Sequence, residues 1–391
     1  MNNEPKQPFS VRRILLQVHL WVGLIFCIPF VILGVTGSYL VYDQDFMTVP
    51  RATAVGEVAA PSEIIAAVNR DGFRTASVTM PSEAGDPAIV RLARITNGEQ
   101  QGPGRGFAGG AQVYVDPVSL EVIGDQERNR TALSDFMHQL HGSLLIGGRE
   151  GRSVVGWLGV GMTLLGITGL VLWWPKCGAW RNAFGVRRDA KGYPFHRQLH
   201  GATGIWGWVV FIIVSFSGVA ISFPATIGPA MHSMLGGQPL PPVNQEIMPV
   251  EGQATIAVDE AVAIALAEQP GSRVVGVFLP GEPEGAMRVT VLATDAVKGT
   301  PATSISIDPY RGEVASVRNP QEGLGNAFMA WQRPLHDGQG LGMIWQFLVF
   351  ASGLMPVLFT ITGTIMWWIK RRNKIAMRVR KQAALEGAPA E

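Results

Sequence analysis

Residues 198–223 read QLHGATGIWGWVVFIIVSFSGVAISF, an uncharged stretch with one histidine near its start. A helix needs about 20 apolar residues to cross the hydrocarbon core of a bilayer, and this stretch is long enough. Three other windows without Asp, Glu, Lys or Arg also meet that length: 14–42, 153–174 and 338–369. Only 16% of the 391 residues are charged, against about a quarter in soluble proteins. The sequence therefore predicts an integral membrane protein with four transmembrane helices.

Basic residues indicate the topology. They gather before the first predicted span, between the second and third, and after the fourth, so the positive-inside rule puts both termini in the cytoplasm and both long connections outside. The predicted segments are a cytoplasmic N-terminus (1–13), a first transmembrane helix (14–42), an outer module (43–137), a histidine segment with the second transmembrane helix (138–175), a cytoplasmic loop (176–197), a third transmembrane helix (198–223), a second outer module (224–330), a histidine segment with the fourth transmembrane helix (331–369) and a cytoplasmic tail (370–391). The net charge of +2 gives no reason to expect nucleic acid as a partner.

An internal duplication organises the chain. The spacing His-x3-Gly-x13-Gly starts at His19 and again at His200, and Ile-Thr-Gly-x3-Trp-Trp starts at Ile167 and at Ile361. The outer segments share Asp-Pro-x3-Glu-Val, at Asp116 and Asp308. The anchors keep one order, so we interpret the protein as two tandem parallel repeats, each a helix, an outer domain and a helix. Such repeats are related by an axis along the membrane normal.

Each outer segment is predicted to form a small α+β module. In both segments one short amphipathic helix precedes three strands of alternating hydrophobicity. Asp116 and Asp308 precede proline after a strand, so we interpret them as turn residues. The segment 104–109 has a formal G-x-G-x-x-G pattern, but it precedes a strand instead of opening a helix, and we reject it as a nucleotide site. Neither cysteine, Cys27 nor Cys177, lies in an outer segment, so no disulfide is expected there.

Six of the seven histidines fall at the ends of the predicted spans, in two layers. The inner layer holds His19, His196 and His200, and the outer layer holds His138, His141 and His336. A strongly polar side chain at membrane depth is costly and indicates a functional site. A single histidine could simply hydrogen-bond between helices, whereas two duplicated layers favour ligation.

Haem fits this pattern better than zinc. A structural zinc site needs four close ligands, whereas haem needs two axial imidazoles from facing helices and small residues around the ring. The duplication pairs His19 with His200 and His141 with His336; His196 and His138 stay open as alternates, because each lies within one helical turn of a paired histidine. Candidate partners for the haem propionates are Arg13, Arg152, Arg197 and Arg333.

These residues together resemble the PepSY-associated transmembrane family. The resemblance rests on the His-x3-Gly openings, the Leu-His pairs before the second and fourth spans, the Ile-Thr-Gly-x3-Trp-Trp endings and the two outer modules, and it covers nearly the whole chain. Within the family the sequence is similar to the dihaem ferric-siderophore reductases of the bacterial inner membrane. The resemblance implies periplasmic PepSY-like modules, two haem b groups held by histidines of facing helices, and outward electron transfer to ferric siderophores or other ferric chelates.

Two other functions stay open at this stage. The PepSY-like modules resemble parts of peptidase propeptides, so the protein could be a regulatory membrane protein that binds a peptidase and has structural histidines. A metal transporter is a weaker alternative, because no acidic residue lies inside a predicted span. If the protein is a reductase, we expect its electron donor to be a quinol or a separate cytoplasmic reductase.

Overall fold

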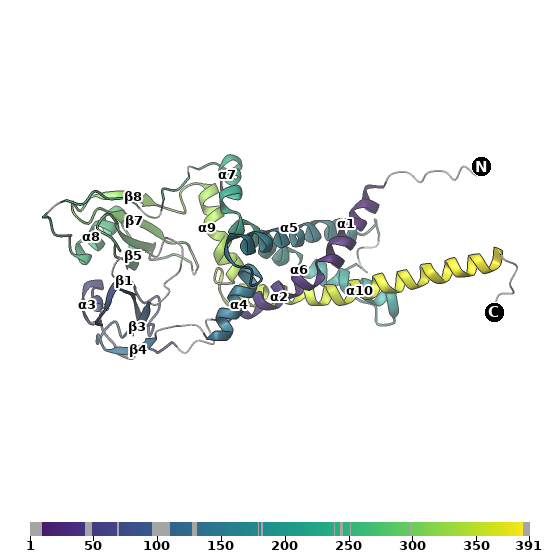
Figure 1. Ribbon diagram of the computed structural model, residues 1–391, viewed down its shortest axis with the longest axis horizontal. Coiled ribbons are helices and arrows are strands. Elements are labelled where there is room, and N and C mark those ends of the chain that lie inside the picture. Colours follow the sequence, from purple (N-terminus) through teal and green to yellow (C-terminus); the bar gives the residue numbers. More distant parts are fainter. Residues whose placement is uncertain are drawn as a thin grey trace. The chain divides into compact units, whose positions relative to one another are not determined.

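The computed structural model describes residues 10–43, 49–68, 70–95, 110–126, 131–178, 180, 183–237, 239–242, 245–250, 252–297 and 299–385. The chain divides into two compact units (Figure 1). The helical unit comprises Met1–Asp43, Phe136–Pro224 and Leu335–Glu391, and the sheet unit comprises Gln44–Asp135 and Ala225–Pro334. The segment 101–109, which contains the rejected glycine motif, lies outside the described residues.

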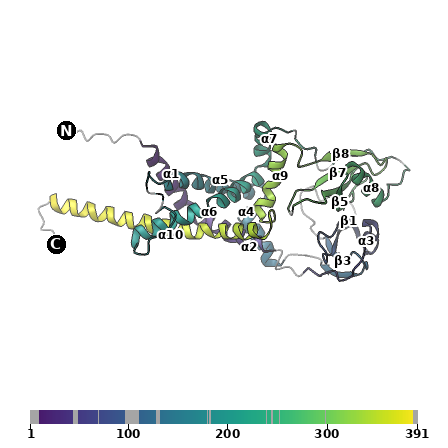
Figure 2. The same ribbon diagram turned by 180° about the vertical axis from the view of Figure 1, so that it is seen from behind.

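Three helices are each long and apolar enough to cross a membrane: α5 (Gly148–Trp173), α6 (Gly192–Ser222) and α10 (Gly342–Leu385). Helices α1 (Val11–Ile25) and α2 (Cys27–Val41) form a fourth span if they are counted as one helix, although the chain bends by 68° at their junction. The protein is therefore a membrane protein with three or four spans. Figure 2 shows α5, α6 and α10 running alongside one another, and α6 packs on both of the others.

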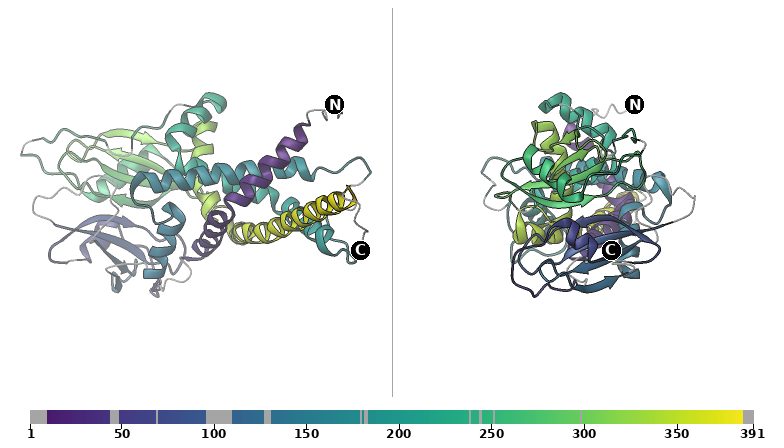
Figure 3. Two further views of the ribbon diagram at one scale, coloured as in Figure 1. Left: turned by 45° about the vertical axis from the view of Figure 1, so that its right-hand side comes forward. Right: turned by 90° about the vertical axis from the view of Figure 1, so that its left-hand side faces the viewer.

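The bend in the first span differs from the continuous helix expected over 14–42, and Figure 3 shows it plainly. Pro29 explains it. Proline has no N–H for the carbonyl of Ile25, and its ring clashes with that carbonyl, so the helix breaks one turn earlier. Beyond the bend, α2 lies so close to α10 at Gly34 and Gly353 that neither position has room for a side chain.

Two short helices separate the outer histidines from the spans that follow. His138 and His141 lie in α4 (Ala132–Ser143), and His336 lies in α9 (Leu324–Asp337). The sequence pattern had merged each of these segments with the next span. At the other end, α10 remains helical to Leu385, through most of the segment expected to be a simple tail.

The sheet unit contains one eight-stranded sheet, to which each of the two predicted outer modules contributes four strands. Its order is β4-β3-β2-β1-β5-β6-β7-β8, so the first four strands mirror the last four. The strands are β1 (Phe73–Thr79), β2 (Ala88–Arg94), β3 (Ala111–Val115), β4 (Val122–Gln126), β5 (Ser272–Phe278), β6 (Met287–Ala293), β7 (Thr303–Ile307) and β8 (Val314–Arg318). β1 and β5 pair in antiparallel fashion at the centre, with Ser77 opposite Phe278.

Helices cover one face of this sheet. α3 (Pro61–Ala66) packs on β1 and β2, and α8 (Val258–Glu268) packs on β5 and β6 (Figure 1). The core between them joins both halves of the sheet, and Ile64, Val78 and Val277 are fully buried in it. A further helix, α7 (Pro224–Leu235), carries the seventh histidine, His232, which hydrogen-bonds Asn326 of α9 at 2.8 Å.

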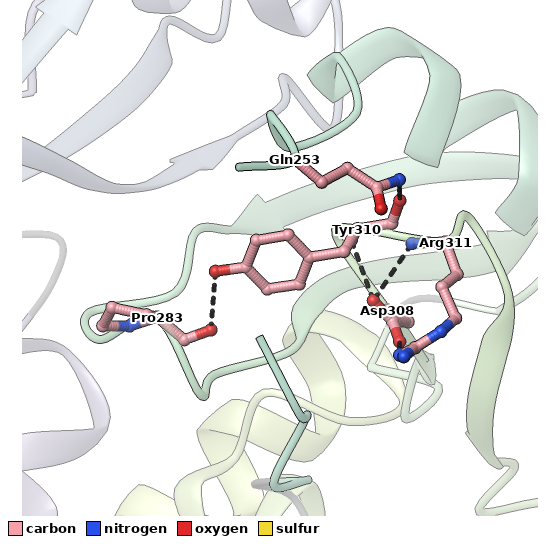
Figure 4. Close-up of polar contacts among 5 residues, drawn as sticks. All are labelled: Gln253, Pro283, Asp308, Tyr310 and Arg311. Atoms are coloured by element: carbon pink, nitrogen blue, oxygen red, sulfur yellow. Dashed lines mark hydrogen bonds and ion pairs between the residues drawn. The ribbon is translucent and has the colours of Figure 1, made fainter. Parts of the chain in front are cut away.

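The two Asp-Pro aspartates are turn residues, as expected. Asp308 accepts hydrogen bonds from the N–H groups of Tyr310 and Arg311 and from the Arg311 guanidinium (Figure 4). Tyr310 in turn donates its hydroxyl to the carbonyl of Pro283 at 3.0 Å. Asp116 accepts four backbone N–H groups, those of Thr53, Ala54, Val118 and Ser119.

Candidate haem-binding site

The structure brings together the two histidine pairs suggested by the duplication. The ring centroids of His19 (α1) and His200 (α6) are 6.3 Å apart. Those of His141 (α4) and His336 (α9) are 6.1 Å apart. Each pair joins helices that are distant in the sequence, and both pairs lie within the helical unit.

The two alternates lie outside these pairs. The His138 ring is 3.8 Å from the buried carboxylate of Asp43. The His196 ring packs on Phe195, and its Nδ1 atom is buried with no hydrogen-bond partner. The arginines suggested as propionate partners, Arg13, Arg152, Arg197 and Arg333, all have exposed side chains, and their role stays a prediction.

Hydrogen bonds determine the tautomer of the outer pair. His141 Nδ1 lies 3.0 Å from the carbonyl oxygen of Leu33, and His336 Nδ1 lies 2.9 Å from that of Val214. A carbonyl only accepts hydrogen bonds, so each Nδ1 carries the proton and donates it. The lone pair of each outer imidazole is therefore on Nε2.

The inner pair reaches the same tautomer through threonines. His19 Nδ1 lies 2.9 Å from Thr168 Oγ1, and His200 Nδ1 lies 2.8 Å from Thr362 Oγ1. Each threonine hydroxyl donates its own proton to a carbonyl four residues earlier in its helix, at 2.7 and 2.8 Å respectively. The hydroxyl can then only accept from the imidazole, which leaves the Nε2 lone pair available for a metal.

A hydroxyl residue followed by glycine supports every one of the four rings. These supports are Thr168-Gly169 for His19, Thr362-Gly363 for His200, Thr36-Gly37 for His141 and Ser217-Gly218 for His336. The glycine lets the ring lie against the helix backbone, and the hydroxyl fixes its rotation. In the sequence these glycines stand out as anchors of the internal repeat. The recurrence of a hydroxyl residue before each of them was a signal that sequence reasoning missed.

The donor set fits haem. Metal–imidazole bonds are about 2 Å long, so two imidazoles that bind one iron from opposite sides have ring centroids roughly 6 Å apart. Both pairs have that separation. Metal-bound histidines also typically donate their second ring nitrogen to a fixed acceptor, as all four do here. Within the described part of the chain, no group of three or more His, Cys, Asp or Glu residues could hold a metal ion.

The chain is thus a membrane protein in which four histidines of the helical unit face each other in two pairs. The chain belongs to the family described as the PepSY-associated TM region, whose model matches residues 16–370. It is also 26% identical over 274 residues to a protein of Pseudomonas aeruginosa that is described as uncharacterized. That match covers 63% of this chain and 66% of the relative, just under two thirds of its length.

Proposed function

We propose that this protein carries electrons across the membrane through two haem b groups and reduces ferric chelates, such as ferric siderophores, on the outer side. The observation that carries the proposal is the pairing of four histidines in two layers, with centroid separations of 6.3 and 6.1 Å. A haem held by two imidazoles cycles between ferric and ferrous iron with both axial positions filled. The role expected of such a centre is electron transfer.

The chain's own residues orient the ligands. In each layer, the acceptors at Nδ1 keep the lone pair on Nε2 and make the imidazole more basic, which favours the ferric state. The glycine beneath each ring keeps the ring close to its helix. In this arrangement His19 and His200 would hold one haem, and His141 and His336 would hold the other.

The proposed topology follows from the charge pattern and the repeated motifs. Both termini would lie in the cytoplasm and the sheet unit in the periplasm of a bacterium, with the chain in the inner membrane. The mirrored strand order of the sheet and the matching histidine supports favour two tandem parallel repeats. The outer histidine pair would then face the compartment in which the chelate is found.

Two half-buried arginines of the sheet unit, Arg288 and Arg318, would attract an anionic chelate. Arg288 and Arg318 lie on the sheet face opposite α3 and α8, since both alternate along their strands with residues that pack in the core. The Arg288 guanidinium stacks on Phe278 at 4.1 Å, and neither arginine forms an ion pair among the described residues. Burial lowers the pKa of Arg288, and the charge of Arg318 lowers it further. Ferric chelates hold iron through hard oxygen ligands, and reduction to Fe(II) weakens that hold.

The experiment is an absorption spectrum of the purified protein, oxidised and then reduced with dithionite. We expect two low-spin b-type haems per chain, one haem after His141→Ala or His200→Ala, and two after the matched changes His138→Ala and His196→Ala. The reduced protein should be reoxidised by a ferric siderophore, and Arg318→Gln should raise the chelate concentration needed for half-maximal rate.

Absence of haem after expression with ample supply would contradict the proposal. It would then favour the regulatory, peptidase-binding interpretation, in which the histidine changes leave function intact and loss of the sheet unit abolishes it.

A further inference from the structure

A groove of about 470 Å³ lies between α1 and the C-terminal end of α5. Apolar side chains form most of its wall, including Leu15, Leu170 and Trp174. Two cations, Arg12 and Lys176, also line it. Arg12 also donates a hydrogen bond to the carbonyl of Leu172 at 2.8 Å, which fixes its guanidinium beside the groove. The volume falls within the range of small-molecule sites, about 300–1,000 Å³.

The groove adjoins the inner histidine site along α1. On α1, Arg12 and Leu15 share a helix face with His19, because they precede it by seven and four residues. On α5, the lining residues Leu170, Val171 and Trp174 lie at the C-terminal end of the helix, within two turns of Thr168. Thr168 is the residue whose hydroxyl accepts from His19. Along α1, the lining residue Leu15 therefore lies one helical turn from His19.

The matching positions of the second half carry different side chains. Tyr193 and His196 precede His200 by the same spacings by which Arg12 and Leu15 precede His19. Lys370 corresponds to Lys176, and its ammonium lies 5.1 Å from the centroid of the Tyr193 ring. The two repeats therefore differ in side chain at these positions.

We infer that the groove binds a lipid-soluble quinol, the electron donor of the proposed function, on which this inference rests. A quinol has an apolar tail and an oxygen-bearing ring. The tail matches the apolar wall of the groove, and the ring oxygens match the hydrogen-bond donors Arg12 and Lys176. Trp174 and Val171 are 55% and 44% exposed, so the groove opens toward lipid in a membrane protein. The ring can enter from the bilayer without crossing water.

The reaction balances without a further reagent. Oxidation of one quinol to the quinone breaks two O–H bonds and releases two electrons and two protons. The electrons reduce two equivalents of ferric chelate to the ferrous state. The protons leave to the water that reaches the exposed side chain of Lys176.

The test is photolabelling of the purified full-length protein with a short-chain azidoquinone, followed by mapping of the labelled peptides. We expect label on the peptides that contain residues 11–15 and 170–176. Arg12→Gln should weaken labelling and slow reduction by decylubiquinol by roughly tenfold, the usual effect of losing a hydrogen bond to a charged group. Leu15→Trp should fill the groove and abolish both. Matched controls outside the groove are Leu16→Trp and Lys374→Gln.

Three results would overturn the inference. Label outside α1 and α5 would move the site elsewhere. Label that phosphatidylglycerol displaces, while quinol-driven reduction is unaffected by Arg12→Gln, would assign the groove to an anionic phospholipid. Loss of haem in Leu15→Trp but not in Leu16→Trp would assign it to the haem itself. Failure of the proposed function has a different signature: label in the groove of a protein that cannot pass dithionite electrons to a ferric chelate.

Discussion

The imidazole of His141 rests directly on the α-carbon of Gly37, so that a methyl group added there would lie 2.9 Å from His141 Cε1. The other three histidines have the same relationship with a glycine of a neighbouring helix. The corresponding distances are 3.1 Å at Gly218, 3.3 Å at Gly169 and 3.9 Å at Gly363. All four rings therefore lie against a glycine, and the space left for a methyl group increases from Gly37 to Gly363.

Glycine-to-alanine changes should follow this grading. Gly37→Ala forces the His141 ring to move, because real contacts of this kind essentially never fall below 3.0 Å. It should therefore lower the haem content of the outer site most, and Gly218→Ala should lower it less. Gly363→Ala introduces an ordinary van der Waals contact and serves as the control. Haem per chain is the measurement, and equal losses in all variants would contradict the steric explanation.

Removal of a supporting hydroxyl should change the ligand without removing it. In Thr168→Val the shape is kept, but His19 Nδ1 loses the hydroxyl acceptor and keeps only the carbonyl of Leu165. Changes to such partners typically cost about 10–100-fold in metal affinity, so haem should dissociate faster and the inner midpoint potential should rise. Thr163→Val is the matched control on the same helix, because the Thr163 hydroxyl bonds only the carbonyl of Gly159 among the contacts described. A redox titration that does not distinguish the two variants would count against the role of the hydroxyl.

The turn aspartates should make the sheet unit sensitive to acid. Hydrogen bonds from the backbone N–H of Ala54 and three other residues lower the pKa of Asp116 from 3.8 to about 2. Because the folded-state pKa is the lower one, this stabilisation is complete above 3.8 and is lost as the pH falls toward 2. Burial alone would raise the pKa of Asp308, but bonds from Tyr310 and Arg311 outweigh it and hold the pKa below its usual value.

Asp116→Asn should therefore destabilise the protein by roughly 2 kcal/mol at neutral pH. Thermal unfolding of the detergent-solubilised chain measures this, and the difference from the parent protein should shrink below pH 4. Asp295→Asn, in an exposed turn, is the control. A difference that does not depend on pH would show that the charge of Asp116 is not the cause.

The proposed topology can be tested with the native thiols. Cys177 is exposed just beyond α5, whereas Cys27 is half-buried in α2. A membrane-impermeant maleimide should label Cys177 only after the cytoplasmic side is opened. Ala315→Cys, at an exposed position of β8 and in a Cys177→Ser background, should react in intact cells once the outer membrane is permeable. Labelling with the opposite sidedness would reverse the direction of electron flow proposed above.

Much of this architecture could be predicted from local patterns. Uncharged windows identified the spans, alternation identified β2 and β6, and the repeated spacing paired the histidines. The pairing of strands that are distant in the sequence could not be predicted in this way. Alternation predicts a strand but not which of its edges pairs with another strand, so it does not predict the pairing of β1 with β5. The short strands β4 and β8 are too exposed to show a clear alternation.

The candidate site shows the same limit. The periodicity of the chain suggested which histidines face each other, but the tautomer depends on carbonyls and hydroxyls of neighbouring helices. Leu33 contributes through its backbone, which its side-chain type does not reveal. Pro29 was visible in the sequence, and its consequence, a bend of 68°, was overlooked because the window around it is uniformly apolar.

The central pairing of Ser77 with Phe278 also has a consequence for biogenesis. Until the ribosome has made β5, the inner edge of β1 has no partner, and the first four strands present an open ladder of amide and carbonyl groups. The sheet unit cannot be completed co-translationally one half at a time. The first four strands remain without their partner strand until β5 has been synthesised, and a chain interrupted after α5 would expose an edge prone to aggregation.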